Sequence, residues 1–294
     1  MKAALSTLLL FCCIAASALP ARTLPFSTVF KGVDRFEALV AKAEAGNWKA
    51  LPIGERTATV GKALVGTPYK SYTLEIDDHI EAASVNLYGL DCWTFFEVAL
   101  AFARMLDEPR EAWTPQTLLR YIELDRYRDG KCTGSYMSRL HYLEEWSYDN
   151  ARRGLIADLT PKLGGVRVAH RAREMTAGWR HYRYMRMNPD IRSGIARMEE
   201  RVTQIGLRMI PKSKVAAIES KLRDGDIISI VSRDGRYNAT SHVGLAVRDS
   251  KGVLRFMHAS SPRNFGKVVI DKRLSGYLYE FSSHTGIMVA RPLR

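Results

Sequence analysis

Apolar residues in the first half of the chain recur at the three- and four-residue spacing of helices. One such apolar face lies within residues 32–46 and consists of Phe36, Leu39, Val40 and Ala43. Further helices are predicted over residues 55–65, 91–106, 114–128 and 138–154. The third of these four begins at Thr114 and Pro115, because threonine is favoured at the N-cap and proline at the first helical position.

The last third of the chain has a different pattern. Short runs of β-branched residues alternate there with Gly, Asp and Asn turns, as in an antiparallel sheet. The runs span residues 224–232, 242–249, 252–260 and 267–274. Helices followed by strands predict an α+β fold, in which the helices pack on one side of an antiparallel sheet or partial barrel.

The segment between these regions, residues 160–214, is rich in Arg, Met and aromatic residues. A helix is expected after Asn188 and Pro189, whereas residues 178–187 also alternate as a strand would. No linker divides the chain of 294 residues, whose apolar content of 46% suffices for a core. We therefore expect one domain over residues 22–294, with the basic segment as an insertion.

The charge balance suggests polyanionic surroundings. The chain has 44 Lys and Arg against 31 Asp and Glu, a net charge of +13. Nucleic acid, an acidic membrane surface, the bacterial cell wall and a solvated basic surface without a partner all fit this charge. The basic run 167–187, with its interleaved aromatic residues, would suit single-stranded nucleic acid, but the N-terminus argues against that partner.

Residues 1–21 have the features of a cleaved export signal. Lys2 precedes an apolar run over residues 5–14, and Ala16 and Ala18 have the spacing that a leader peptidase needs. Cleavage is expected after Ala18 or Ala21, which makes the protein periplasmic or secreted. The apolar run is too short to span a membrane, so we expect no stable membrane insertion.

The signal carries two of the four cysteines, Cys12 and Cys13. Lipid anchoring through either is disfavoured because Leu10 and Phe11 fit a lipoprotein signal poorly. The mature chain keeps Cys92 and Cys132. These two could pair in an exported protein, although a chain of this size needs no disulfide and Cys132 lies in a glycine-rich turn.

Cys92 occupies an unusual position for a buried structural cysteine, because it follows a good N-cap, Asp91, at the start of an apolar helix. Unpaired N–H groups and the helix dipole there favour a thiolate and would lower the pKa of the thiol. The same N–H groups could stabilise the oxyanion of an attacked amide. His242 and His258 lie at the ends of two predicted neighbouring strands. One histidine could therefore accept the thiol proton, and the other could orient the first histidine.

Two alternatives from other classes remain. A metal amidase would need ligands such as H-E-x-x-H, which is absent, and His141 with Glu144 on one helical face is more typical of a solvated pair. We expect neither a metal nor a cofactor. A wall-binding protein without activity would be expected to have lost Cys92 or His242, and both are present.

Several motifs together resemble a known group of enzymes. "GTPY" at 66–69, "LDCWTFFEVAL" at 90–100, "SHVGLAV" at 241–247 and "MHASS" at 257–261 are similar to the NlpC-type superfamily of cell-wall cysteine peptidases, which has a papain-like α+β fold. "GSYMSRLHYLEEW" at 134–146 resembles the branch called N-acetylmuramoyl-L-alanine amidase-like.

The resemblance implies a role for each matching residue. Cys92 would be the nucleophile, His242 the general base and His258 the orienting group. Five residues would contact substrate, namely Tyr69, Asp91, Arg139, His141 and Ser241; Asp91 would mainly cap the helix, and Arg139 and His141 could bind a carboxylate of the peptide stem.

The resemblance also implies the substrate. The expected partner is peptidoglycan or its muropeptide fragments, and the expected reaction is hydrolysis of an amide through a thioester. The branch implies the bond between N-acetylmuramate and L-alanine, whereas the wider superfamily implies the γ-D-glutamyl bond to a diamino acid.

Overall fold

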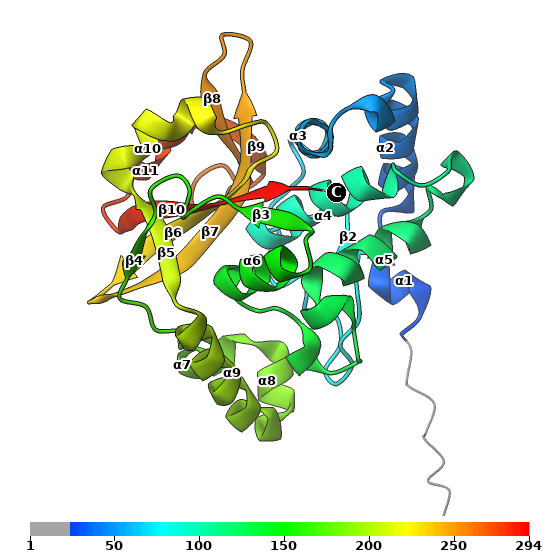
Figure 1. Cartoon of the computed structure of the whole chain (residues 1–294). Coiled ribbons are helices and arrows are strands. Elements are labelled where there is room, and N and C mark those ends of the chain that lie inside the picture. Colours follow the sequence, from blue (N-terminus) through cyan, green and yellow to red (C-terminus); the bar gives the residue numbers. More distant parts are fainter. Residues whose placement is uncertain (1–23, 294) are drawn as a thin grey trace, which may run out of the picture.

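A computed structural model describes residues 24–293 (Figure 1). The predicted signal, with Cys12 and Cys13, lies outside the described residues. Within residues 24–293, no helix has both the length and the apolar character that crossing a membrane requires.

The first half of the described chain is helical, as its apolar spacing predicts. Its helices are α1 (Phe26–Val29), α2 (Val33–Ala45), α3 (Ile53–Ala63), α4 (Cys92–Met105), α5 (Pro115–Arg126) and α6 (Leu143–Arg152). Two short strands, β1 (Phe30–Lys31) and β2 (Val85–Asn86), pair in parallel among them. The helix expected from residue 138 begins only at Leu143, so Arg139 and His141 precede it.

The second half forms a large antiparallel sheet with the strand order β4-β5-β10-β6-β7-β8-β9, and β3 pairs with β10. The strands are β3 (Ile156–Asp158), β4 (Val166–Val168), β5 (Leu207–Pro211), β6 (Ile227–Asp234), β7 (Tyr237–Arg248), β8 (Leu254–Ala259), β9 (Val268–Arg273) and β10 (His284–Pro292). The four predicted strand runs correspond to β6, β7, β8 and β9.

Helices cover both faces of this sheet, so the expectation of helices on one side only is wrong. The α4 side buries Ile227 and Leu245, whereas α10 (Lys212–Ile218) and α11 (Leu274–Tyr279) cover Ile228 and Ala246 on the other side (Figure 1). Successive residues of β6 and β7 are apolar, and strands with apolar side chains on both faces bury both.

Helix α4 lies in the centre of the larger core. Its side chains from Thr94 to Met105 are all buried, among them Phe95, Phe96 and Phe102. Ten or more buried positions in succession leave no solvated face on this helix. Helix α4 therefore holds its first residue, Cys92, in a fixed position against the sheet.

The basic segment 160–214 contributes β4, β5, the start of α10 and three whole α-helices, α7 (Glu174–Ala177), α8 (Arg183–Met187) and α9 (Arg192–Ile205). The possible strand over 178–187 forms a 3₁₀ turn and α8 instead. The neighbours Tyr184 and Met185 are both buried against α9, which an alternating strand would not allow. These helices pack below the sheet in Figure 1.

Candidate active site

Asp91 is the N-cap of α4, as the sequence predicts, and it forms a capping box with Thr94. The Oδ1 atom of Asp91 accepts the backbone N–H of Thr94 at 2.8 Å, and the Oγ1 atom of Thr94 accepts the N–H of Asp91 at 2.9 Å. A cap of this kind stabilises a helix by about 1 kcal/mol. It makes Cys92 the first helical residue and turns its N–H group toward the open end of the helix.

His242 lies on β7 next to a β-bulge. Ile230 pairs with His242 and Val231 pairs with Thr240, so Ser241 is an extra residue between them. The Ser241 hydroxyl is hydrogen-bonded to that of Ser232 at 2.7 Å. Bulges redirect the side chains beside them and are common next to active sites.

The bulge brings the predicted residues of two distant segments together. Cys92, Ser241 and His242 line one cavity of about 470 Å³, which we call the histidine cavity. Cys92 and Cys132 are both free thiols in the structure, so no disulfide occupies the candidate nucleophile. The geometry therefore fits a thiol and an imidazole that act on one bound molecule.

The third predicted residue, His258 on β8, is hydrogen-bonded to the base. The Nε2 atom of His242 lies 2.7 Å from the Nδ1 atom of His258, whose Nε2 atom lies 3.3 Å from the Oδ2 atom of Asp271. A carboxylate accepts, so His258 carries its proton on Nε2 and its Nδ1 accepts from His242. This arrangement leaves the Nδ1 atom of His242 unprotonated and able to accept a proton.

Asp271 on β9 is a site residue that was not predicted from the sequence. His258 pairs with Val269 in the β8–β9 hairpin, so Asp271 is its diagonal neighbour on the same face. An acidic residue in the β-branched run "KVVID" is the signal that could have found it. Its pKa is lowered, chiefly by the hydrogen bond to His258, so it is ionised at neutral pH.

Protonation at the site differs from the expectation. Burial raises the pKa of the Cys92 thiol to about 12, with the charge of Asp91 acting in the same direction. The backbone N–H groups of Val243, Trp93 and Cys92 lower it by less. The predicted lowering of the thiol pKa at the helix start is therefore wrong, because burial outweighs the N–H groups of the helix.

His242 is also neutral. Burial holds its pKa well below the usual 6.5, and the neighbouring His258 and His284 act in the same direction. A neutral thiol beside a neutral imidazole suits general-base catalysis, in which the proton moves as the sulfur attacks.

Trp93 also lines a second cavity, of about 300 Å³, which we call the tyrosine cavity. It is lined by the predicted residues Tyr69, Asp91, Arg139 and His141. Trp93, His141, Met175 and Tyr182 line both cavities, so the two adjoin. Seven of the eight predicted site residues thus line at least one of these two cavities. The eighth, His258, is hydrogen-bonded to His242, which lines the histidine cavity.

Comparison with protein families identifies the chain. The model of the AmiA-like family, described as N-acetylmuramoyl-L-alanine amidase-like, matches residues 59–287. The chain belongs to this family. The matched residues include every candidate residue from Tyr69 to Asp271.

Solved structures support this membership of the amidase-like family. An N-acetylmuramoyl-L-alanine amidase from Bacteroides uniformis is 28% identical with a TM-score of 0.71, over 82% of this chain and 99% of that one. A protein from Bacteroides fragilis, provisionally named a xylanase, is 33% identical with a TM-score of 0.68, over 80% of this chain and 99% of that one.

A more distant structure shares the fold alone. It is a Legionella pneumophila protein, 19% identical with a TM-score of 0.64, over 89% of this chain and 95% of that one. No curated protein sequence matches the chain.

In this member of the amidase-like family, Arg139 is buried and already paired. Its Nη2 atom lies 2.9 Å from Glu75, its Nε atom 3.6 Å from Glu81, and its guanidinium packs on the Tyr136 ring. His141 donates from Nε2 to the Tyr136 carbonyl at 2.9 Å, and burial holds its pKa well below 6.5. Neither residue therefore presents a free positive charge to a substrate carboxylate.

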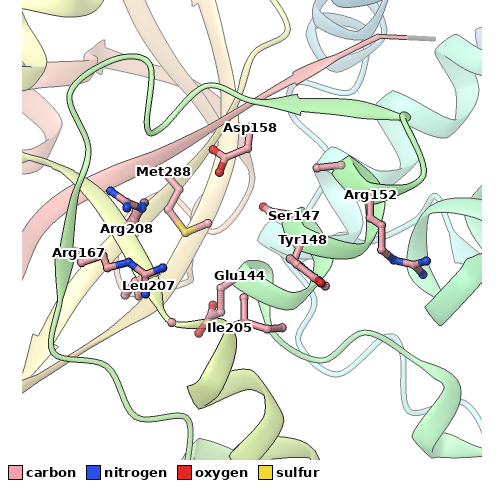
Figure 2. A pocket seen from close by; sticks show the side chains of 12 residues that line it. Glu144, Ser147, Tyr148, Arg152, Asp158, Arg167, Ile205, Leu207, Arg208 and Met288 are labelled. Carbon is pink, nitrogen blue, oxygen red and sulfur yellow. The ribbon is translucent and has the colours of Figure 1, made fainter.

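A third cavity, of about 310 Å³, lies on the other side of α6 (Figure 2). Arg167 and Arg208 face Ser147 and Tyr148 across it, and none of the predicted site residues lines it. Glu144 links it to the histidine cavity, since it accepts a hydrogen bond of 2.7 Å from the hydroxyl of Thr240, which lines that cavity.

Proposed function

We propose that the protein is an exported cysteine amidase that hydrolyses the bond between N-acetylmuramate and L-alanine in peptidoglycan or muropeptides. One observation carries the proposal: Cys92, at the start of α4, lines the same cavity as His242, and His242 is held by His258. Membership of the amidase-like family supports the reaction class. A helix-borne cysteine beside a histidine on an antiparallel sheet also supports a papain-like, NlpC-type assignment.

The first step is attack by the sulfur. The Cys92 sulfur bonds to the amide carbonyl carbon while the thiol proton moves to Nδ1 of His242. The carbonyl π electrons move to the oxygen, which accepts from backbone N–H groups in the first turn of α4. His258 and Asp271 stabilise the imidazolium, since His242 donates to His258 and His258 donates to Asp271.

The second step is departure of the amine. His242 gives its proton to the amide nitrogen as the carbon–nitrogen bond breaks, which releases the stem peptide and leaves a thioester on Cys92.

Water then attacks the thioester while His242 accepts a proton from the water. The carbon–sulfur bond breaks, the muramyl carboxylic acid leaves and gives its remaining proton to solvent, and His242 returns the other proton to the thiolate.

The choice of bond rests on the family. The γ-D-glutamyl bond to a diamino acid would be cut by the same chemistry, and the products distinguish the two. The amidase releases the intact stem peptide, whereas the endopeptidase leaves L-alanyl-D-glutamate on the sugar.

Export is proposed from the features of residues 1–21. Expression of the full chain in a bacterial host, followed by N-terminal sequencing of the periplasmic fraction, tests it. A mature protein that begins after Ala18 or Ala21 is expected, and a full-length cytoplasmic protein would contradict export.

The activity is tested on purified muropeptides, with products identified by mass spectrometry. Wild type and Cys132→Ala are expected to release the stem peptide, and Cys92→Ala is expected to release none. Cys132 is the matched control because it is the other free thiol of the described chain. Unchanged turnover by Cys92→Ala would contradict the mechanism, and loss of activity with a chelator would favour a metal enzyme.

A further inference from the structure

Cys92 lies where two cavities of different chemistry meet. The histidine cavity contains Cys92 and His242, and the tyrosine cavity contains Asp91, which directly precedes Cys92. Trp93 and Tyr182 form part of both walls. A substrate whose amide reaches the sulfur therefore has room for one part of itself on each side.

The proposed reaction decides which part lies on which side. His242 must protonate the departing nitrogen, so the amine product lies beside His242. The acyl part remains on the sulfur and extends the other way, toward the tyrosine cavity. For a muramyl peptide, the stem peptide is the amine and the sugar belongs to the acyl part.

The tyrosine cavity has the lining that a sugar ring needs. Tyr72 lines this cavity, is 57% exposed and has a φ of 58°, in the left-handed region. A bulky residue in that region is uncommon, and such conformations cluster at ligand sites. The rings of Tyr69 and Tyr182 also line the cavity, and aromatic faces pack against the C–H faces of pyranoses.

The tyrosine hydroxyls suit sugar hydroxyls. Burial raises the pKa of Tyr182 to about 12 and raises that of Tyr69, so both phenols stay neutral. A neutral phenol both donates and accepts hydrogen bonds, as a sugar hydroxyl does.

The histidine cavity instead carries exposed charges of opposite sign, whereas Asp91 and Arg139 of the tyrosine cavity are already bonded within the protein. Glu174 and Arg233 are exposed on its wall, and within residues 24–293 neither forms an ion pair. The third charged residue there, Asp234, is already paired with Arg173 at 3.3 Å. A stem peptide carries carboxylates that Arg233 could bind, and a diamino acid adds an amine that Glu174 could bind.

We propose that the tyrosine cavity is a saccharide subsite, in which Tyr72 packs against the muramyl sugar, and that Arg233 and Glu174 bind the stem peptide in the histidine cavity. The proposal rests on the proposed amidase function. Tyr72 would thus select the sugar half of the substrate, and Arg233 and Glu174 would select the peptide half.

Binding of each half is tested separately by calorimetry, in the Cys92→Ala protein so that nothing turns over. The probes are the disaccharide N-acetylglucosaminyl-N-acetylmuramic acid and the tripeptide L-alanyl-γ-D-glutamyl-diaminopimelate. Both are expected to bind at once without competing. Tyr72→Ala is expected to weaken disaccharide binding about tenfold and to change tripeptide binding by less than about twofold.

Arg233→Gln and Glu174→Gln are expected to show the reverse. Each should weaken tripeptide binding about tenfold and leave disaccharide binding unchanged. Tyr148→Ala is the matched control, because Tyr148 is 55% exposed and lies outside both cavities. It should change neither affinity, and circular dichroism should show every variant folded.

Competition between the two probes, absence of disaccharide binding, or equal weakening of both probes by Tyr72→Ala would overturn the proposal. The proposed function can fail independently. If the wild type does not cleave the muramyl bond but the probes bind as described, the subsites stand and the amidase assignment falls. If it cleaves the bond and the binding pattern is absent, the subsites fall alone.

Discussion

The Nε2 atom of His242 lies 2.7 Å from the Nδ1 atom of His258, with Asp271 behind it. Since the two rings meet through nitrogens and the carboxylate accepts the last proton, one tautomer is selected for each imidazole. The Nδ1 atom of His242 thereby keeps a free lone pair, and His242 lines the cavity that contains Cys92. The predictions below test this arrangement and the residues that support it.

Replacing Asp271 should impair catalysis through tautomer choice. In Asp271→Asn, the amide can also donate, so His258 is no longer held with its proton on Nε2. We expect kcat to fall about 10- to 100-fold while KM changes little.

Steady-state kinetics on a muramyl peptide measure the effect. Asp249→Asn is the control, because Asp249 is a carboxylate in the turn between β7 and β8 that pairs with Arg255 instead. An unaltered kcat in Asp271→Asn would show that Asp271 does not position His258.

Gly244 keeps β7 close to β8. A Cβ atom there would lie 2.4 Å from the Met257 carbonyl oxygen and 2.8 Å from the Cβ of His258. Gly244→Ala should therefore displace His258, lower the free energy of unfolding by about 1–3 kcal/mol and reduce kcat.

Urea denaturation and kinetics check both effects of Gly244→Ala. Gly276→Ala is the control, since a Cβ atom there meets no atom within 4 Å. A stable and fully active Gly244→Ala protein would refute the close packing of these strands.

The thiol of Cys92 should alkylate slowly at neutral pH. Its pKa of about 12 leaves it protonated, and only the thiolate reacts with iodoacetamide. In Cys132→Ala protein, the alkylation rate should rise about tenfold for each pH unit from 7 to 10 without a plateau.

Mass spectrometry of the Cys92 peptide follows this reaction, and Cys92→Ala protein gives the background. A rate that reaches a plateau below pH 7 would instead indicate a preformed thiolate–imidazolium pair.

Arg139 should be important for stability. Its removal would leave the buried carboxylates of Glu75 and Glu81 without their cation. We expect Arg139→Met to lower the free energy of unfolding by about 3–5 kcal/mol, because an uncompensated buried charge is costly.

Chemical denaturation measures the change, with Arg120→Met as control, since Arg120 is exposed and pairs with Glu108. A fully stable Arg139→Met protein with a raised KM would instead restore the substrate-binding role that the family resemblance implies.

The sequence predicts the parts of the site that depend on local rules. Asp91 and Cys92 follow from capping, which involves only the next three residues. His258 lies near the end of β8, as its predicted strand indicates, and none of these three positions needs knowledge of packing. The expectation that His242 opens its strand is wrong, because β7 begins at Tyr237 and His242 lies beside the bulge within it.

The remaining features depend on distant residues. Asp271 meets His258 only through the register of a hairpin, and the partners of Arg139 lie 64 and 58 positions away in the chain. The thiol pKa depends on how fully the fold buries the sulfur, which no local pattern contains. Burial of the second face of the sheet likewise depends on how α10 and α11 pack against it, which no local pattern contains.

The central claim is that Cys92 takes the muramyl acyl group from the stem peptide. Rapid acid quenching during turnover of a muramyl peptide, followed by peptide mass spectrometry, tests it most directly. We expect to find the muramyl acyl group as a thioester on the peptide that contains Cys92, and to find free stem peptide as the first product. A glutamyl adduct on Cys92, or product formation by a protein in which Cys92 is replaced by alanine, would contradict it.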